Sequence, residues 1–435
     1  MLGYYVGMAV RNMRRNVVLT ALMIMAVSVG IGASMTLLTA LRAMSADPIP
    51  AKSDRLFSVR LDNWGPDVPN NALLSDLLSY PDAMAFMRAH RGVRQSLMYE
   101  TQFSVTPPGS SDAIALAATA RAVYSDFFQM FDVPFAAGTR WSRIDDADHA
   151  NVIVLGARIA ARLFPSGDAL GRTLTLGNQD YRIIGVLAPW RFQPRVYDLT
   201  PGIYQETEDV FLPLTTAVDH RLGTYGGIYC NKPVSSDFER MSRSECRWVQ
   251  FWVELASSAQ RRSYLQFLNN YSREQNRTGR FHWPPRVSLL NVNETLQAEH
   301  IIPGGVRIAT VAAFGFLIVC LVNATGLMLA KLSSRLAEFS VRRALGARRS
   351  QIFAQCLAEA AAVGVGGGML GVGLLVLGLA FERVVLREDY ARLIRLDSNA
   401  VVTALGLALV TVIFAALYPA WHTSRLAPAW KLKAE

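Results

Sequence analysis

The chain has 435 residues, of which 51% are hydrophobic, and it carries a formal net charge of +10. This length exceeds that of one small domain and fits two or three modules. Three short segments next to apolar stretches, 1–16, 331–351 and 419–435, hold 12 of the 44 Lys and Arg residues but only two acidic residues. The rest of the chain contains 32 basic and 32 acidic residues, so its charges balance. The positive charge is therefore not spread over a nucleic-acid-binding surface, and no nucleic-acid partner is expected.

Four stretches each contain 19 to 25 consecutive uncharged residues. A helix of about 20 apolar residues spans the roughly 30 Å hydrocarbon core of a bilayer. Such long runs disfavour buried helices of a soluble core and predict four transmembrane helices (17–41, 307–330, 353–381 and 400–418). The first run is longer than the apolar region of a signal peptide, about 7–15 residues, and predicts an uncleaved anchor.

The basic flanking segments orient these helices in the lipid bilayer. Cytoplasmic loops of membrane proteins carry an excess of Lys and Arg. This rule places both termini and one connection in the cytoplasm (1–16, 331–352 and 419–435). It places a large domain, 42–306, and a short loop, 382–399, on the outer side.

The outer region has the pattern of an α+β domain. Alternating or continuously apolar runs predict strands, and amphipathic runs predict helices between them. The segments in chain order are a strand at 56–61, a helix at 80–90, a strand at 151–155, a helix at 157–164, a hairpin over 173–186, a strand at 210–213 and a helix at 257–275. We expect a large α+β fold divided into two subdomains.

Two of the four cysteines, Cys230 and Cys246, lie in this outer region, 16 positions apart. Thiols outside the cytoplasm oxidise, so the pair can form a disulfide that stabilises a glycine-containing segment. The alternative is two separate thiols, because the sequence does not show their geometry.

Sequence motifs for catalysis are absent from these 435 residues. There is no G-x-x-x-x-G-K-[ST], H-E-x-x-H, Cys-x-x-Cys or G-x-S-x-G. The histidines are scattered, which favours no metal site. We therefore expect a non-catalytic chain that binds no nucleotide or metal cofactor itself.

The cytoplasmic connection 331–352 follows the second span directly. Apolar residues recur there at helical spacing, with Val341 at the edge of the face (Leu336, Phe339, Ala344 and Leu345). Gly346 is expected to end this helix, and the next helix to begin near Arg349. The residues alone leave two interpretations open: a helix that docks on a cytoplasmic partner, or a basic loop attracted to anionic lipid.

Residues 338–347 read E-F-S-V-R-R-A-L-G-A, and they resemble the E-I-G-I-R-R-A-L-G-A motif of the MacB/FtsX-like (type VII) ABC transporter permease family. Seven residues agree, and Ser340 in place of glycine is the clearest departure. The resemblance implies that this segment contacts an ATPase, through Glu338, Phe339, Val341, Arg342, Arg343, Ala344, Leu345, Gly346 and Ala347.

Further segments that resemble the family extend over nearly the whole chain. They include 125–138, 152–155, 161–164, 181–186 and 418–421, whereas 426–430 follows the family only loosely and the segment around Cys230 and Cys246 resembles an insertion. The resemblance implies a permease of the bacterial inner membrane with a MacB-like periplasmic domain. ATP and Mg²⁺ would bind a separate cytoplasmic ABC ATPase dimer.

The resemblance also implies a dimer, with a second protomer that is identical or paralogous. The third predicted span contains seven glycines between residues 360 and 381, and small residues let helices approach closely in lipid. We expect helix interfaces at Gly364, Gly367, Gly368 and Gly371, and at the polar residue Asn323 of the second span. Glu359 lies at the cytoplasmic edge of the third span.

The implied mechanism is a movement passed from the ATPase to the outer domain. It predicts export of an antibiotic, peptide or siderophore through a periplasmic adaptor and an outer-membrane duct. Two alternatives stay open: a mechanotransmitter that activates a periplasmic hydrolase or signals envelope stress without transport, and lipoprotein extraction.

Overall fold

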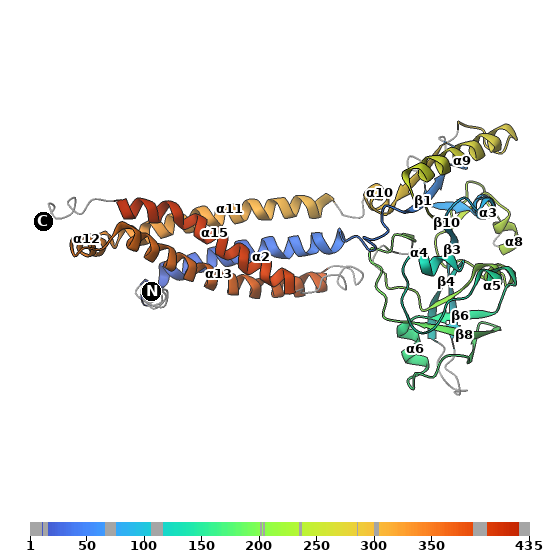
Figure 1. The fold of residues 1–435 in the computed structure, drawn as a ribbon, viewed down its shortest axis with the longest axis horizontal. Helices are drawn as coiled ribbons and strands as arrows, with labels where there is room; N and C mark the ends of the chain where they lie inside the picture. The colour runs from blue at the N-terminus through green and yellow to red at the C-terminus, as the bar shows by residue number, and fades with distance from the viewer. Residues whose placement is uncertain are drawn as a thin grey trace. The chain divides into compact units, whose positions relative to one another are not determined.

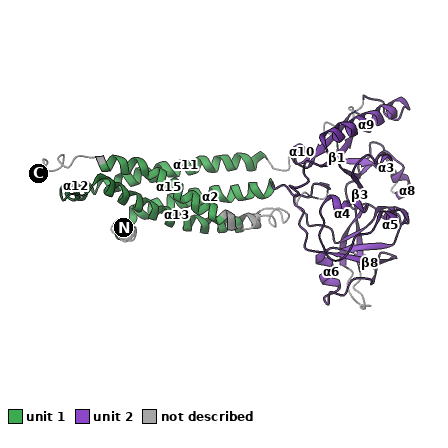
Figure 2. Ribbon diagram, viewed as in Figure 1, with its two compact units in different colours: residues 1–45, 302–435 green, residues 46–301 purple. Residues whose placement is uncertain are grey.

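The computed structural model describes residues 11, 16–65, 75–105, 116–200, 202, 205–234, 237–284, 286–299, 304–385 and 398–425. The chain forms two compact units, which Figure 2 shows in different colours. Residues 1–45 and 302–435 form a helical bundle, and residues 46–301 form an α/β domain.

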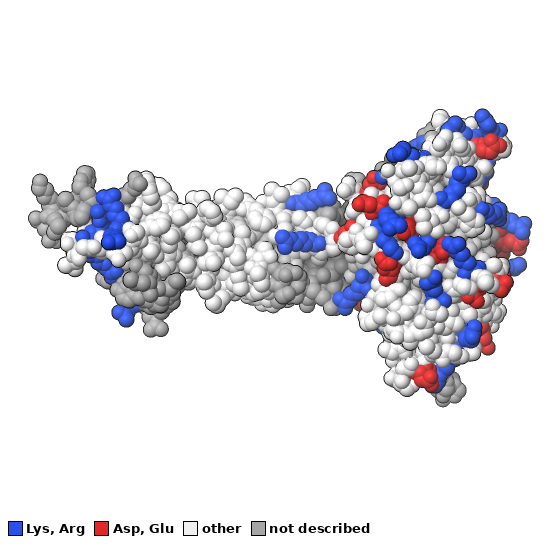
Figure 3. Space-filling view, in the orientation of Figure 1, with Lys and Arg blue, Asp and Glu red and all other residues white. Residues whose placement is uncertain are grey.

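Four helices of the bundle are long and apolar enough to cross a membrane. They are α2 (Val17–Met44), α11 (Gly304–Ser333), α13 (Arg349–Val385) and α15 (Ser398–Arg425). A short fifth helix, α12 (Leu336–Ala344), connects α11 to α13 (Figure 1). Along the described helices, the face seen in Figure 3 is largely free of charged side chains between the two ends.

Several predicted boundaries differ from these helices. The observed connection is shorter than the predicted one, 331–352, because α11 continues to Ser333 and α13 already begins at Arg349. The fourth helix does not end at residue 418: α15 continues through Pro419 to Arg425. A proline removes one backbone hydrogen bond of a helix. Within a bundle of membrane helices, this loss bends a helix more often than it ends the helix. Most of the predicted segments 1–16, 382–399 and 419–435 lies outside the described residues.

Helix α13 packs against α2 and α15 through glycines on two of its faces. A Cβ atom added at Gly367 would lie 2.8 Å from Val27 Cγ1 of α2, and one at Gly371 would lie 3.2 Å from Ile31. On the other face, a Cβ at Gly368 would lie 3.0 Å from the Cβ of Ala408 in α15. Because these positions carry no side chain, the helix backbones approach closely, which is how helices associate in lipid.

The described strands of the α/β domain form one sheet of eleven strands, in the order β11-β1-β10-β3-β4-β9-β6-β8-β5, with β2 against β10 and β7 against β3 and β8. The β4–β9 and β6–β8 pairs are parallel, and the other pairs are antiparallel. The strands are β1 (Leu56–Leu61), β2 (Leu77–Ser79), β3 (Arg94–Val105), β4 (Leu116–Val123), β5 (Phe135–Gly138), β6 (Val152–Leu155), β7 (Thr173–Leu176), β8 (Gln179–Leu187), β9 (Val210–Pro213), β10 (Arg247–Glu254) and β11 (Val287–Asn291).

Helices cover both faces of this sheet, which is why several central strands are buried throughout. They are α3 (Tyr80–Ala89), α4 (Asp126–Met130), α5 (Arg143–Ala147), α6 (Ala157–Leu163), α7 (Leu214–Asp219), α8 (Phe238–Ser242), α9 (Ser258–Arg277) and α10 (Val292–Ala298). In β6, Ile153 packs into one core and Val154 into the other. Alternate residues of a strand face opposite sides, so the two cores lie on opposite faces of the sheet.

The large α/β domain expected from the sequence is present, and it has two separate hydrophobic cores. The two cores belong to one continuous sheet, in which β3 and β4 pair over eight residues each. Individual predicted elements are present as well: the hairpin over 173–186 is β7 and β8, and its turn contains Gly177 with a φ of +61°. The sequence shows local periodicity, but strand order depends on contacts between distant residues.

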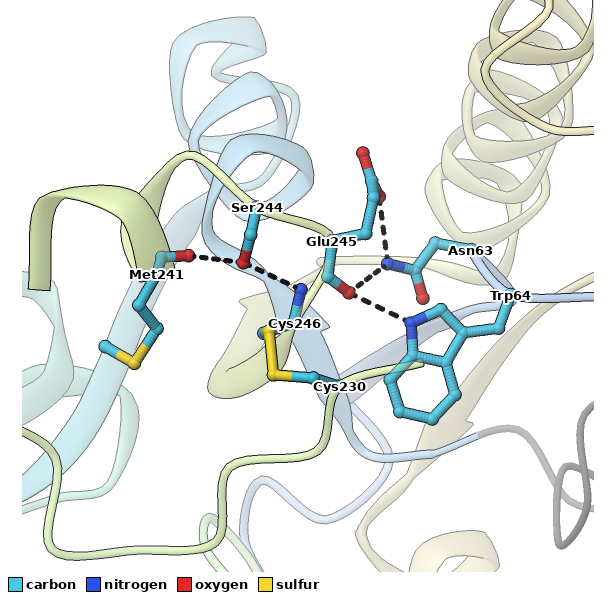
Figure 4. The surroundings of a disulfide bond; sticks show 7 residues. All are labelled: Asn63, Trp64, Cys230, Met241, Ser244, Glu245 and Cys246. Atoms are coloured by element: carbon cyan, nitrogen blue, oxygen red, sulfur yellow. Dashed lines mark hydrogen bonds between the residues drawn. A yellow bond between two sulfur atoms is a disulfide. The ribbon is translucent and has the colours of Figure 1, made fainter. Parts of the chain in front are cut away.

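Cys230 and Cys246 form a disulfide immediately before β10 (Figure 4). The carbonyl oxygen of the neighbouring Glu245 accepts hydrogen bonds from Asn63 Nδ2 at 3.0 Å and from Trp64 Nε1 at 2.9 Å. The bridge thus holds the irregular segment around Cys230 against a buried strand that is itself fixed to the end of β1.

A cluster of buried charges lies where β3, β4 and β10 meet the irregular segment between β8 and β9. Arg121 of β4 pairs with Glu208, with Asp198 at 2.6 Å and with Glu100 at 3.2 Å. Arg195 pairs with Glu100 and Glu208, both at 3.0 Å. Burial raises the pKa of Asp198, but Arg121 and Arg195 outweigh it and hold this pKa below its usual value.

Candidate functional site

The short helix α12 and its contacts form the candidate functional site. Only Ser334 and Arg335 separate α12 from the end of α11. The helix ends at Ala344, and Gly346 then adopts a φ of +100°, a conformation that glycine reaches without a Cβ clash. The segment is thus a defined helix with a short connection on its N-terminal side.

One face of α12 turns toward the bundle. Phe339 is 3% exposed and belongs to the bundle core, together with Ile352 and Cys356 of α13. The guanidinium of Arg335 lies 5.2 Å from the centre of the Phe339 ring, a cation–π distance. Burying this one aromatic side chain attaches α12 to the membrane helices.

Ion pairs on the same side of α12 connect it to α13. Glu338 accepts hydrogen bonds from Arg342 Nη2 at 2.8 Å and from Arg335 Nε at 3.1 Å. Arg335 also donates from Nη1 to Glu359 Oε1 of α13 at 2.8 Å. Arg342 donates to Gln355 Oε1 of α13 at 3.0 Å. Two arginines therefore bridge α12 to successive turns of one membrane helix.

A lysine extends this network to α11 and α2. Lys331, in the last turn of α11, lies 3.8 Å from Glu359 Oε2 and donates a hydrogen bond to Thr20 Oγ1 of α2 at 3.1 Å. Both Lys331 and Glu359 are almost fully buried. A buried charge is strongly destabilising unless it is paired, so the two cations and the carboxylate depend on each other.

The opposite face of α12 is apolar and exposed. Val341 is 59% exposed and Leu345 is 83% exposed, and they lie four residues apart on one side of the helix. Ala344 is also exposed, whereas Arg343 and Ala347 are half-buried. Figure 3 shows basic side chains at this end of the bundle. Among the large apolar side chains of the described residues, Leu345 has the largest exposed fraction.

The predicted contact residues are therefore divided between two roles. Val341, Ala344 and Leu345 face outward, whereas Glu338, Phe339 and Arg342 hold the helix to the bundle. Lys331 and Arg335 were not among the residues predicted for this site. Their only sequence signal was the spacing of Arg335 three residues before Glu338, which places both on one helix side.

The predicted interface residues also differ in their surroundings. Gly364 and Gly368 lie against α15, and Gly367 and Gly371 lie against α2. Asn323, predicted at a helix interface, has an exposed side chain on α11. Its position in an apolar helix did not show which side of α11 faces the bundle.

Two protein families match the chain. The family described as "MacB-like periplasmic core domain" matches residues 20–264, and the family described as "FtsX-like permease C-terminal" matches residues 310–428. The first match alone covers more than half of the chain.

Similar curated proteins are exporters by name. A "Macrolide export ATP-binding/permease protein MacB" of Azoarcus sp. (strain BH72) is 26% identical over 434 residues, which is 98% of this chain and 59% of that protein. A "Pyoverdine export ATP-binding/permease protein PvdT" of Pseudomonas syringae pv. tomato is 26% identical over 312 residues, 71% of this chain and 42% of that protein. The chain spans about 60% of the length of the first of these relatives.

Among solved structures, the periplasmic region of MacB from Actinobacillus actinomycetemcomitans is similar, with 12% identity and a TM-score of 0.37. The similarity covers 59% of this chain and 97% of that structure.

Proposed function

Because this chain belongs to the MacB/FtsX-like family of ABC transporter permeases, we propose that it couples ATP hydrolysis by a partner ATPase to movement of its α/β domain. The 435 residues contain no nucleotide-binding P-loop, so ATP and Mg²⁺ are assigned to that partner. The chain itself transmits force and catalyses no reaction.

The observation that carries this proposal is the two-sided structure of α12. The exposed pair Val341 and Leu345 offers an apolar surface for a groove on an ATPase. On the other side, Arg335 and Arg342 connect the helix to α13, and Lys331 connects the network to α2. A displacement of α12 therefore acts on three membrane helices. Helices α2 and α11 continue along the chain into the α/β domain, which is inserted between them.

We place the protein in a bacterial inner membrane, with α12 and both termini in the cytoplasm and the α/β domain in the periplasm. The distribution of Lys and Arg around the four spans supports this orientation. The disulfide between Cys230 and Cys246 agrees with it, since disulfides persist in oxidising compartments. A membrane-impermeant thiol reagent applied to intact spheroplasts should label Asp168→Cys and leave Arg348→Cys unmodified; the reverse result would overturn the orientation.

A second protomer, identical or paralogous, is assigned to the exposed side of α11. Asn323 lies there in an apolar helix, where an unpaired amide facing lipid is costly. Gly315 and Gly326, three turns apart, have open space where a Cβ would be. Small residues and one amide are suited to a close contact between membrane helices.

The cargo we propose is an antibiotic, a peptide or a siderophore, passed on through a periplasmic adaptor and an outer-membrane duct. The names of the relatives support export, since one is named for macrolides and another for pyoverdine. Genes for an adaptor and a duct beside the gene for this chain would support export over the alternatives of mechanotransmission and lipoprotein extraction.

The test uses the full chain, tagged and purified from its native membrane. We expect an ATPase with a P-loop to copurify, and ATP-dependent export to require it. The double variant Val341→Asp and Leu345→Asp should lose the ATPase from the complex. The control Ile144→Asp makes the same change at a residue of the α/β domain that is 71% exposed. If the double variant retains a normal, active complex, the docking role of α12 is wrong.

A further inference from the structure

The α/β domain contains a cavity of about 560 Å³ beside the C-terminal half of β3. We call it the β3 pocket. It is lined by Thr101–Phe103 of β3, by the β7–β8 turn, by His220 and by the chain from Leu222 to Tyr225. None of the lining residues is Asp, Glu, Lys or Arg, and amide and hydroxyl side chains alternate with Phe103, Leu176 and Tyr225. Its volume lies within the 300–1,000 Å³ of typical ligand sites.

The backbone of Gln102 faces this pocket. Its partner in β4 is Thr119. The N–H of Thr119 donates to Asp209 Oδ2 and its C=O accepts from Asp209 N, so both groups point away from β3. In an antiparallel pair, residues that do not bond each other point their N–H and C=O to opposite edges. Gln102 therefore presents its N–H and C=O to the edge of β3 away from β4, as Glu100 does two residues earlier.

Both neighbours on this edge already have partners. The carbonyl oxygen of Glu100 accepts a hydrogen bond from Tyr225 N at 2.8 Å, and Val105 pairs with Leu176 of β7. Between these two contacts, nothing in the described part of the chain pairs with the main chain of Gln102. An unpaired donor and acceptor on a sheet edge form a template for an added strand.

The walls of the β3 pocket are held in place before any ligand arrives. Thr101 Oγ1 donates to Gly223 O at 2.7 Å, and Tyr99 Oη donates to Leu222 O at 3.0 Å. Farther along, Tyr229 pairs with Arg247 of β10, and the disulfide fixes Cys230. The ring of Tyr225 is 54% exposed between these anchors. A preformed site loses little conformational entropy on binding.

We propose that the β3 pocket binds a short, uncharged peptide segment in an extended conformation, with one of its residues paired to the N–H and C=O of Gln102. The pairing of main-chain groups selects for a peptide, and a lining without Asp, Glu, Lys or Arg offers no carboxylate, ammonium or guanidinium partner to a charged side chain. Tyr225 supplies an aromatic surface beside the bound strand. This inference goes beyond the coupling function and does not depend on it, because the pocket lies wholly within the α/β domain.

The first test varies the ligand and leaves the protein intact. Saturation-transfer NMR would measure binding of acetyl-Thr-Val-Thr-amide to the full chain in lipid nanodiscs. Since alternate residues of a strand point their N–H groups to opposite sides, methylation of one amide nitrogen should weaken binding at least tenfold. Methylation of the neighbouring amide should have little effect. Equal binding of all methylated peptides, or no binding of the parent peptide, would overturn the proposal.

The second test varies the pocket. Gln102→Pro removes the N–H that faces the ligand and no bond to β4, so peptide affinity should fall at least tenfold. Tyr225→Ala should weaken binding about tenfold, by the usual contribution of an aromatic contact. Ile228→Ala, at another exposed residue of the same segment that does not line the pocket, is the matched control and should bind as the parent does. Binding that is unchanged in Tyr225→Ala, or equally reduced in Ile228→Ala, would contradict the pocket assignment even if Gln102→Pro does not fold.

Discussion

The two units of this protein bury charge in different ways. In the α/β domain, two arginines and three carboxylates form a cluster with almost no exposure, fixed by strands on several sides. In the bundle, the charged network begins at the buried residues Lys331 and Glu359 and ends at the partly exposed pair of Glu338 and Arg342. The first arrangement joins strands and a loop into one body. The second connects α12 to the membrane helices, which is what the proposed transmission of movement requires.

The packing differs in the same direction. The cores of the α/β domain use aromatic side chains, such as Phe127, which contacts five other rings. The bundle instead uses glycines, so that α13 lies very close to α2 and α15. Water drives aromatic side chains together in a soluble domain, whereas in lipid the close fit of helix surfaces provides the attraction.

The largest effect should follow from breaking the cluster in the α/β domain. Arg121→Met leaves Glu208, Asp198 and Glu100 with a single arginine, and we expect the free energy of unfolding to fall by about 3–5 kcal/mol. Urea unfolding of the full chain, followed by tryptophan fluorescence, would measure it. Arg158→Met is the control, since this arginine is half exposed and its ion pairs should contribute about 1 kcal/mol or less. If Arg121→Met and Arg158→Met lowered the free energy of unfolding by similar amounts, the buried cluster would be no more important for stability than an exposed ion pair.

A smaller effect should follow from disturbing the glycine contacts of the bundle. Gly367→Leu places a side chain where a Cβ would already be 2.8 Å from Val27, so we expect a loss of about 1–3 kcal/mol. Gly373→Leu makes the same change on the same helix, where nothing lies within 4 Å. Thermal unfolding in detergent should separate the two variants. A melting temperature lowered equally in both would argue against close packing at Gly367.

The network at α12 should affect coupling more than stability. In the parent chain, Arg335 Nε lies 3.1 Å from Glu338 Oε2. In the double variant Glu338→Lys and Arg342→Glu, the two exchanged residues can still pair with each other, but the lysine at position 338 faces the positive charge of Arg335. We expect a stability change of about 1 kcal/mol. ATP-dependent function of the complex should be lost, with normal membrane insertion. Retained function would show that the orientation of α12 does not depend on this network.

The smallest effect concerns pH. Because the folded-state pKa of Asp198 lies below its usual value, the unfolded chain binds protons there more readily. The stability from this group is therefore complete above the unfolded pKa, near 3.9, and is lost as the pH falls through the folded pKa. Urea midpoints between pH 6 and pH 3 should decline more steeply for the parent than for Asp198→Asn. Burial raises the pKa of Glu100, so this residue makes the parent more stable as the pH falls, opposite to Asp198. Because Glu100 is present in both proteins, the difference between the parent and Asp198→Asn isolates the effect of Asp198.

How far the sequence could predict the structure depended on the distance between contacting residues. The end of α12 was predictable, because Gly346 is a local signal, and so was the β7–β8 hairpin. The inward face of α12 was not, because Phe339 and Val341 are both apolar and only packing distinguishes them. Arg121 pairs with Glu208 across 87 positions, and no periodicity indicates such a partner. Lys331 could be counted as a cytoplasmic charge, but its burial depends on Glu359 and Thr20, which lie on other helices.

The shortness of the link between α11 and α12 limits how the bundle can respond to force. Two residues offer almost no slack, and Arg335, one of the two, is itself bound to Glu338 and Glu359. A pull on α12 therefore cannot be absorbed by stretching a loop. In the proposed coupling, a movement of α12 would therefore reach the end of α11 with little loss in the two-residue connection between them.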